Sequence, residues 1–158
     1  MSNQTSQPGN RAHASATKEV RVIEQRCIEK GLRMTDQRRV IARVLSEAAD
    51  HPDAEELHRR AAAVDANISL ATVYRTVKLF EDSGIIERHD FRDGRSRYEE
   101  APKEHHDHLI DAKSGAVIEF QSDEIEKLQV EIARKLGYKL VDHRLELYGV
   151  PLNEDEKK

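Results

Sequence analysis

The sequence has 158 residues and a formal net charge of −4; 35 % of the residues are charged and only 4 % are aromatic. This length fits one large domain or two small ones, each with a modest aliphatic core. No apolar run approaches the roughly 18 residues of a membrane span, so we expect no membrane partner.

The N-terminal residues have no apolar segment of the kind a secretory signal needs. We therefore expect a disordered polar tail over residues 1–17 and a cytoplasmic location. The single cysteine, Cys27, excludes an internal disulfide and a thiolate zinc cluster. Because Cys27 falls on an apolar stripe, we predict that it is a small buried hydrophobe.

The charge is unevenly distributed along the chain. Residues 18–100 contain 16 lysines and arginines against 17 acidic residues, whereas residues 101–158 contain 9 against 13. The acidic excess therefore belongs to the C-terminal part. The nearly neutral N-terminal part, with several arginine-rich faces, remains compatible with nucleic-acid binding.

The spacing of apolar residues predicts four helices, over residues 18–31, 35–49, 53–64 and 69–84. The last three begin at N-cap residues Thr35, Asp53 and Ser69, and the first and fourth end at glycines. The side chains expected to face inward on the first and fourth helices are Val20, Ile23, Cys27, Ile28, Leu70, Val73, Val77 and Phe80.

A β-hairpin is predicted directly after the fourth helix. Residues 85–91 and 95–100 flank Arg92-Asp93-Gly94, a typical turn sequence. Short helices followed by a hairpin are typical of a winged helix-turn-helix. We therefore predict a DNA-binding domain over residues 18–100, with the fourth helix as its recognition helix.

A second domain is predicted over residues 104–151, after a hinge at 101–103. Residues 108–111 and 116–120 form a second predicted hairpin, Ser122 caps a helix over 123–137, and residues 138–150 alternate as a strand. This small α/β unit is best completed by pairing with a second copy, which predicts a homodimer. The overall class is α+β, with a disordered tail over 152–158.

Four candidate metal ligands, His105, His106, Asp107 and His108, stand in a row before this unit's first strand. In an extended segment successive side chains point to opposite faces. His105 and Asp107 then share one face, and His106 and His108 share the other. A single ion does not easily reach all four, so the spacing predicts two half-sites that need further ligands.

Candidates for the missing ligands lie in both domains. His143 and Glu126 are placed to join His105 and Asp107 within the second domain. His51, before the third helix, and Glu99, at the end of the wing, are placed to join the other pair across the hinge. The alternative for each of these histidines is a packed residue without a ligand role.

Several motifs together resemble the ferric uptake regulator family of metal-sensing transcription factors, over roughly residues 20–150. They are LRMTDQRRVI, DAEEL, SLATVYRTVKLF, SGIIERHDF, HHDHLID and GAVIEF. The resemblance implies a winged-helix domain joined to an α/β dimerisation domain. It also implies a regulatory metal site at His51, Glu99, His106 and His108, and a second site at His105, Asp107, Glu126 and His143. Glu119 is a further candidate to join or bridge a site.

The sequence departs from the family at one point. Many members bind a structural zinc with a CxxC pair just after the histidine cluster and with later cysteines. Here the first two positions are Asp111 and Ser114, and no cysteine follows. We therefore expect no structural zinc, and dimer stability then depends on packing and on the second histidine–carboxylate site.

The recognition helix offers candidate DNA contacts on its outward face. The residues left facing outward are Ser69, Thr72, Tyr74, Arg75 and Lys78. The resemblance implies that Tyr74 touches thymine methyl groups, that Arg75 contacts a base or phosphate, and that Arg33 reaches the minor groove. The alternative for Arg75 and Lys78 is a solvated surface.

The expected function is a metal-dependent dimeric repressor of metal-uptake genes that binds a double-stranded DNA operator. Imidazole and carboxylate ligands suit Fe²⁺ or Mn²⁺, and Zn²⁺ is expected to bind in vitro. Alternatives are a zinc, peroxide or haem sensor of the same family, a metal store, and a metalloenzyme. The sequence contains no nucleophile motif, so we expect neither an enzyme nor a small-molecule substrate.

Overall fold

The computed structural model describes residues 22–102 and 104–153 of the chain, which divide into two compact units. The first unit contains residues 22–90 and 96–101, and the second contains 91–95 and the residues from 102 onward. The predicted tail over 1–17, Val20, Lys103 of the predicted hinge and residues 154–158 lie outside the described residues. None of the described helices combines the length and apolar character that crossing a bilayer requires.

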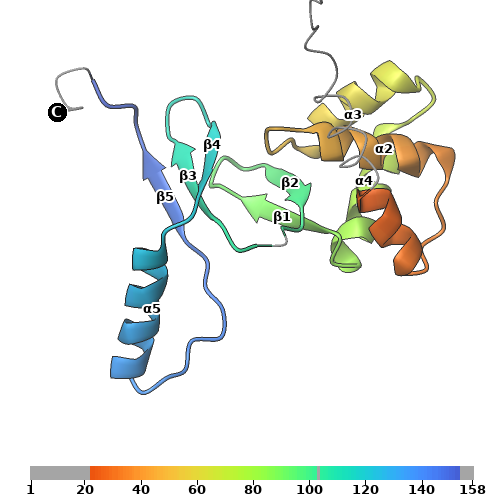
Figure 1. Cartoon of the computed structure of the whole chain (residues 1–158). Coiled ribbons are helices and arrows are strands. Elements are labelled where there is room, and N and C mark those ends of the chain that lie inside the picture. The colour runs from red at the N-terminus through yellow and green to blue at the C-terminus, as the bar shows by residue number, and fades with distance from the viewer. Residues whose placement is uncertain (1–21, 103, 154–158) are drawn as a thin grey trace, which may run out of the picture. The chain divides into compact units, whose positions relative to one another are not determined.

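The described residues of the first unit form four helical segments (Figure 1). Residues 22–29 are helical and are followed by α2 (Asp36–Glu47), α3 (Ala54–Val64) and α4 (Leu70–Asp82). The predicted caps are confirmed, because Thr35, Asp53 and Ser69 each accept a hydrogen bond from a first-turn backbone amide. Such caps satisfy amides that have no partner within the helix.

The core of the first unit is mainly aliphatic, with Phe80 and Tyr98 as its buried aromatic side chains. Phe80, Ile23 and Cys27 are fully buried, and burial raises the pKa of the Cys27 thiol to about 11. Two expectations were wrong: Ile28 is 53 % exposed, and Leu70 is only half-buried. The buried stripe of α4 passes through Thr76 instead, one helical turn before Phe80.

The wing is a two-stranded antiparallel hairpin of β1 (Ile86–Asp90) and β2 (Ser96–Glu100). In its register, Glu87 lies opposite Glu99 and His89 lies opposite Arg97. The turn includes Gly94 at φ 75°, a backbone conformation that favours glycine. Helices followed by this hairpin form the winged helix that the sequence predicts.

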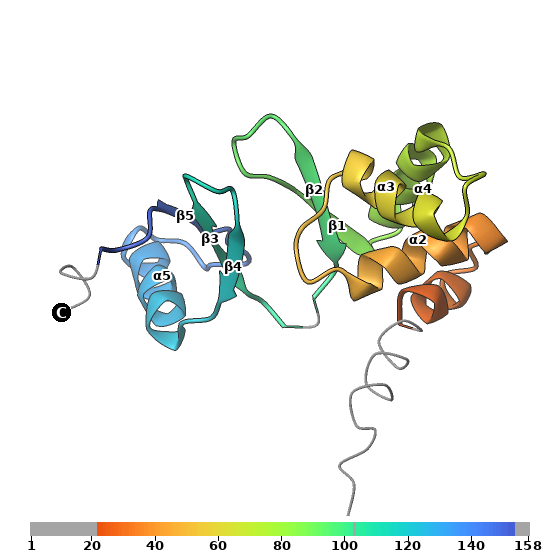
Figure 2. The same ribbon diagram turned by 90° about the horizontal axis from the view of Figure 1, so that it is seen from above.

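As far as it is described, the second unit consists of a three-stranded sheet and one helix. It contains β3 (Asp107–Asp111), β4 (Val117–Phe120), α5 (Asp123–Lys135) and β5 (Glu146–Gly149). The strand order is β4-β3-β5, with β3 antiparallel to β4 and parallel to β5 (Figures 1 and 2). The α+β class is confirmed.

The predicted strand over 138–150 was wrong for most of its length, because only residues 146–149 form β5. A strand extends only where its neighbour offers backbone partners, and β5 pairs with just four residues of β3. His143 therefore lies before the strand. His105 and His106 likewise precede β3, which begins at Asp107.

An apolar surface of the second unit is exposed. Leu109 of β3 lies between Ile118 of β4 and Leu147 of β5 in the register, and the latter two are 54 % and 42 % exposed. The helix α5, which is described over its whole length, has no buried residue. Its exposed apolar residues include Leu128 and Ile132. Exposed apolar side chains in this number are typical of an interface.

Candidate metal centres

Three of the predicted second-site residues come together in the second unit. Nε2 of His105 lies 3.1 Å from Oδ1 of Asp107, and Nε2 of His143 lies 3.4 Å from the same oxygen. The two imidazole rings are 4.1 Å apart between centroids. Two residues of the 105–108 segment and the loop before β5 therefore supply one compact cluster.

This cluster fits a divalent ion on two grounds. Asp107 is 1 % exposed, so its carboxylate is removed from water and needs a cation or hydrogen-bond donors. Nε2 of His143 is buried and makes no hydrogen bond within the described part of the chain, although it faces Asp107. Glu126, the fourth predicted ligand, is absent from the described side chains that approach this closely. Its role stays a prediction.

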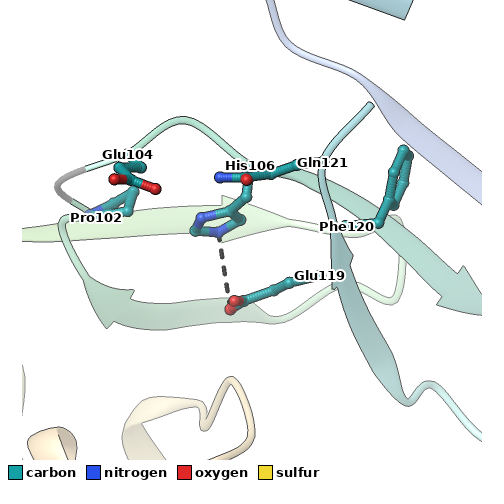
Figure 3. A pocket seen from close by; sticks show the side chains of 6 residues that line it. All are labelled: Pro102, Glu104, His106, Glu119, Phe120 and Gln121. Carbon is teal, nitrogen blue, oxygen red and sulfur yellow. Dashed lines mark ion pairs between the residues drawn. The ribbon is translucent and has the colours of Figure 1, made fainter. Parts of the chain in front are cut away.

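The other pair from the histidine row lies together with Glu119. The rings of His106 and His108 are 4.9 Å apart between centroids, and Nε2 of His106 lies 3.7 Å from Oε1 of Glu119. Glu119 is opposite His108 in the β3–β4 register. Figure 3 shows the His106 ring directed toward the Glu119 carboxylate, at a pocket that Glu104 and Gln121 also line.

The structure therefore brings together the two groupings that alternation predicts. His105 lies with Asp107, and His106 lies with His108. The alternating placement extends beyond the strand itself, because His105 and His106 directly precede β3. Gln121 helps to position this segment by donating a hydrogen bond from its side-chain amide to the backbone oxygen of His105 at 2.7 Å.

In the first unit, His51 and Glu99 are in direct contact. Nε2 of His51 lies 2.8 Å from Oε2 of Glu99, and both side chains are largely buried. The chain before α3 is fixed against β2, because the amide of Tyr98 donates to the carbonyl of Pro52 at 3.0 Å. This backbone contact determines where His51 meets the end of the wing.

Sequence reasoning missed His89. Its Nε2 lies 2.6 Å from Oε1 of Glu99, so the two oxygens of this carboxylate each contact a different imidazole. The signal was present in the hairpin pattern. Glu87 and His89 alternate onto one face of β1, and counting outward from the predicted turn Arg92-Asp93-Gly94 places Glu99 opposite Glu87.

The turn between β3 and β4 contains Asp111 and Ser114, the two positions at which the sequence departs from the family pattern that it resembles. The Ser114 hydroxyl donates to Oδ2 of Asp111 at 2.6 Å, and the amide of Lys113 donates to Oδ1 at 2.8 Å. The Ser114 hydroxyl and the Lys113 amide together lower the pKa of Asp111. Hydrogen bonds therefore stabilise this turn, and the donor set here contains no thiolate.

The candidate DNA-contacting residues are on the surface of the first unit. Tyr74 is 49 % exposed, Arg75 is exposed, and Thr72 is half-buried at the helix start. Lys78 is exposed but forms an ion pair with Asp82 at 2.7 Å, which raises the pKa of its ammonium group. Ser69 and Arg33 are also exposed. Their contacts with DNA stay predictions.

Comparison with known proteins shows the family to which the chain belongs. Residues 29–148 match the Ferric uptake regulator family. A "Ferric uptake regulation protein" from Rhizobium leguminosarum bv. viciae is 68 % identical over 136 residues, covering 86 % of this chain and 96 % of the relative. The chain belongs to the ferric uptake regulator family. It is therefore a metal-dependent transcription regulator and not an enzyme.

Solved structures show the same fold. A structure described as a "zinc-bound manganese uptake regulator" is 70 % identical, with a TM-score of 0.74, and the match covers 83 % of this chain and 99 % of that one. The Helicobacter pylori ferric uptake regulator is 29 % identical, with a TM-score of 0.75 and coverage of 90 % and 94 %. Its structure is described as revealing three functional metal binding sites.

Proposed function

We propose that this chain is a dimeric repressor that Fe²⁺ or Mn²⁺ activates to bind operator DNA and control metal-uptake and homeostasis genes. The proposed regulatory ligands are His51, Glu99, His106 and His108. The strongest support is that each half of this set is already assembled within its own unit. His51 contacts Glu99 in the first unit, and His106 neighbours His108 in the second.

The proposed switch is electrostatic and geometric. Without metal, Glu99, Asp107, Glu119 and Glu126 gather negative charge that repels DNA phosphate. An ion bound by both halves of the regulatory set joins the winged unit to the dimerisation unit. This fixes the distance between two copies of α4, so that both enter the major groove about one helical turn apart. Metal and DNA then bind with reciprocal coupling, typically ~1–3 kcal/mol.

Both Fe²⁺ and Mn²⁺ satisfy the donor set of imidazole nitrogen and carboxylate oxygen. The names of similar proteins support each ion, since one is a ferric uptake regulation protein and another a manganese uptake regulator. Zn²⁺ is expected to bind more tightly than either in vitro, because affinity rises along this metal series. Since the proposed partner is genomic DNA, the expected location is the cytoplasm.

Anaerobic fluorescence anisotropy with a duplex from a metal-uptake promoter tests the proposal. The full-length chain is titrated separately with Fe²⁺ and Mn²⁺, and DNA affinity is measured at each concentration. The activating ion is expected to raise DNA affinity by about 5–150-fold. The ion that acts at its cellular concentration identifies the physiological metal. Equal affinity with and without both ions contradicts the proposed switch.

We propose a second copy of the chain as the partner of the exposed apolar surface. Ile118, Leu147 and the apolar residues of α5 are exposed, and β4 and β5 are edge strands. Pairing two copies covers these edges and buries the apolar side chains. The cluster at His105, Asp107 and His143 is the proposed second metal site, which supports this dimerisation unit.

Replacing Leu147 with glutamate is expected to weaken the dimer about a hundredfold, because an unpaired charge in an apolar interface costs roughly 3 kcal/mol. Sedimentation equilibrium over a range of concentrations measures the change. Val64→Glu is the matched control, since Val64 is 52 % exposed but belongs to the first unit. An unchanged dimer in Leu147→Glu shows that this surface is not the interface.

Replacing Arg75 with alanine is expected to cost about 1–3 kcal/mol of operator-binding free energy, if its guanidinium forms a bidentate base contact. Arg75 is exposed on α4, and Nη2 lies within 3.3 Å of Thr72 Oγ1, on the outward face. Anisotropy at saturating metal measures the loss. Arg134→Ala on α5 makes the same charge change in the other unit. Equal affinities for both variants refute a specific role for Arg75.

A further inference from the structure

The wing contains a cluster of ligand-type side chains, of which the proposed regulatory set uses only Glu99. Nε2 of His89 lies 2.6 Å from Oε1 of Glu99 and 3.7 Å from Oε2 of Glu87. One ligand atom from each of these three residues lies within 4.8 Å of the other two. All three belong to the first unit, so the cluster is complete without any residue of the second.

The hairpin register explains why these side chains meet. Glu87 is directly opposite Glu99, and His89 follows Glu87 by two residues, so all three project from one face of the two strands. Two carboxylates directly opposite each other on a hairpin destabilise the pairing. A cation between them reverses this effect, and the imidazole of His89 adds a neutral nitrogen donor.

Burial varies across the cluster in a way that suits ion entry. The side chains of His89 and Glu99 are each only 10 % exposed, whereas that of Glu87 is 51 % exposed. His51 contacts the other oxygen of Glu99 and so holds the carboxylate in place. The cluster therefore has a buried base, in which His51 holds Glu99, and one solvent-facing carboxylate, that of Glu87.

We propose that Glu87, His89 and Glu99 form a divalent transition-metal site on the wing. Two carboxylate oxygens and one imidazole nitrogen suit Mn²⁺, Fe²⁺, Co²⁺ or Zn²⁺, with water completing the coordination. This wing site shares Glu99 with the proposed regulatory set but needs neither His106 nor His108. The winged unit thus binds an ion independently of the dimerisation unit.

Mn²⁺ binding to the full-length His106→Ala variant, measured without DNA from the loss of the free-ion electron paramagnetic resonance signal, tests this site. His106→Ala removes a proposed regulatory ligand, so Mn²⁺ binding at the other proposed sites is measured without an intact regulatory site. Glu87→Gln is then added, since Glu87 is half exposed and its replacement keeps the shape of the side chain. His89→Gln is the second variant, and Glu47→Gln is the matched control for a lost surface charge. Circular dichroism verifies that each variant is folded.

Glu87→Gln and His89→Gln are each expected to weaken one class of bound Mn²⁺ by at least about tenfold, while Glu47→Gln leaves the isotherm unchanged. The ring resonances of His89 are expected to broaden on Mn²⁺ addition in the His106→Ala background and not after Glu87→Gln. Identical isotherms for all variants, or equal weakening by Glu47→Gln, contradict the proposed metal site. The three side chains then form an ion-pair network that binds no metal. Because no DNA is present, this result is independent of whether the proposed repressor function is correct.

Discussion

Replacing Phe80 with alanine is expected to lower the free energy of unfolding of the winged-helix unit by about 3–5 kcal/mol. Phe80 is fully buried and is among the largest side chains of the core cluster to which α2, α3 and α4 all contribute. The truncation loses apolar burial and leaves a cavity that the surrounding helices fill only in part. Because α4 carries the proposed DNA contacts, operator affinity is expected to fall with stability.

Urea denaturation of the full-length chain, followed by circular dichroism, measures this effect. Tyr74→Ala is the matched control, since it removes an aromatic side chain from the same helix at a position that is 49 % exposed. Its stability cost is expected to stay below about 1 kcal/mol. Similar losses of unfolding free energy in the two variants contradict a special contribution of Phe80 to the core.

Replacing Glu99 with glutamine is expected to reduce metal-dependent operator affinity by at least about 10–100-fold. The carboxylate contacts His51 through one oxygen and His89 through the other. It is also the ligand common to the proposed regulatory and wing sites. Glutamine keeps the size of the side chain but removes its negative charge and replaces one oxygen by an amide nitrogen, which is a poor metal ligand.

The control for this variant is Glu100→Gln, one residue further along β2. Glu100 forms an ion pair with Arg26 at 3.5 Å. Both variants are compared by anisotropy with Mn²⁺ and, separately, by thermal unfolding without metal. A Glu99→Gln protein that keeps wild-type metal dependence, or that matches Glu100→Gln, contradicts a ligand role for Glu99.

Local sequence signals predicted much of the fold because they act within a few residues. Thr35, Asp53 and Ser69 cap helices through their own first-turn amides. The Arg92–Gly94 turn determines the wing because its backbone angles suit a tight reversal. The two groupings of the histidine row likewise follow from the alternation of extended chain.

Features that depend on long-range pairing were not predictable in this way. The length of β5 is limited by the length of β3, its parallel neighbour, so alternation over 138–150 overestimated the strand. The contact of His89 with Glu99 follows from the alternation within β1 only when the hairpin register is also counted across the turn. His143 reaches Asp107 from a loop rather than from a strand face, a placement that no periodic pattern specifies.

The central claim is that a metal ion at His51, Glu99, His106 and His108 activates operator binding. The most direct measurement compares His106→Ala with His105→Ala, two adjacent histidines in different clusters. Anaerobic anisotropy records operator affinity with and without the activating ion. The account predicts that His106→Ala loses the metal dependence while His105→Ala retains most of it. Equal metal dependence in both variants, at the wild-type level, contradicts the account.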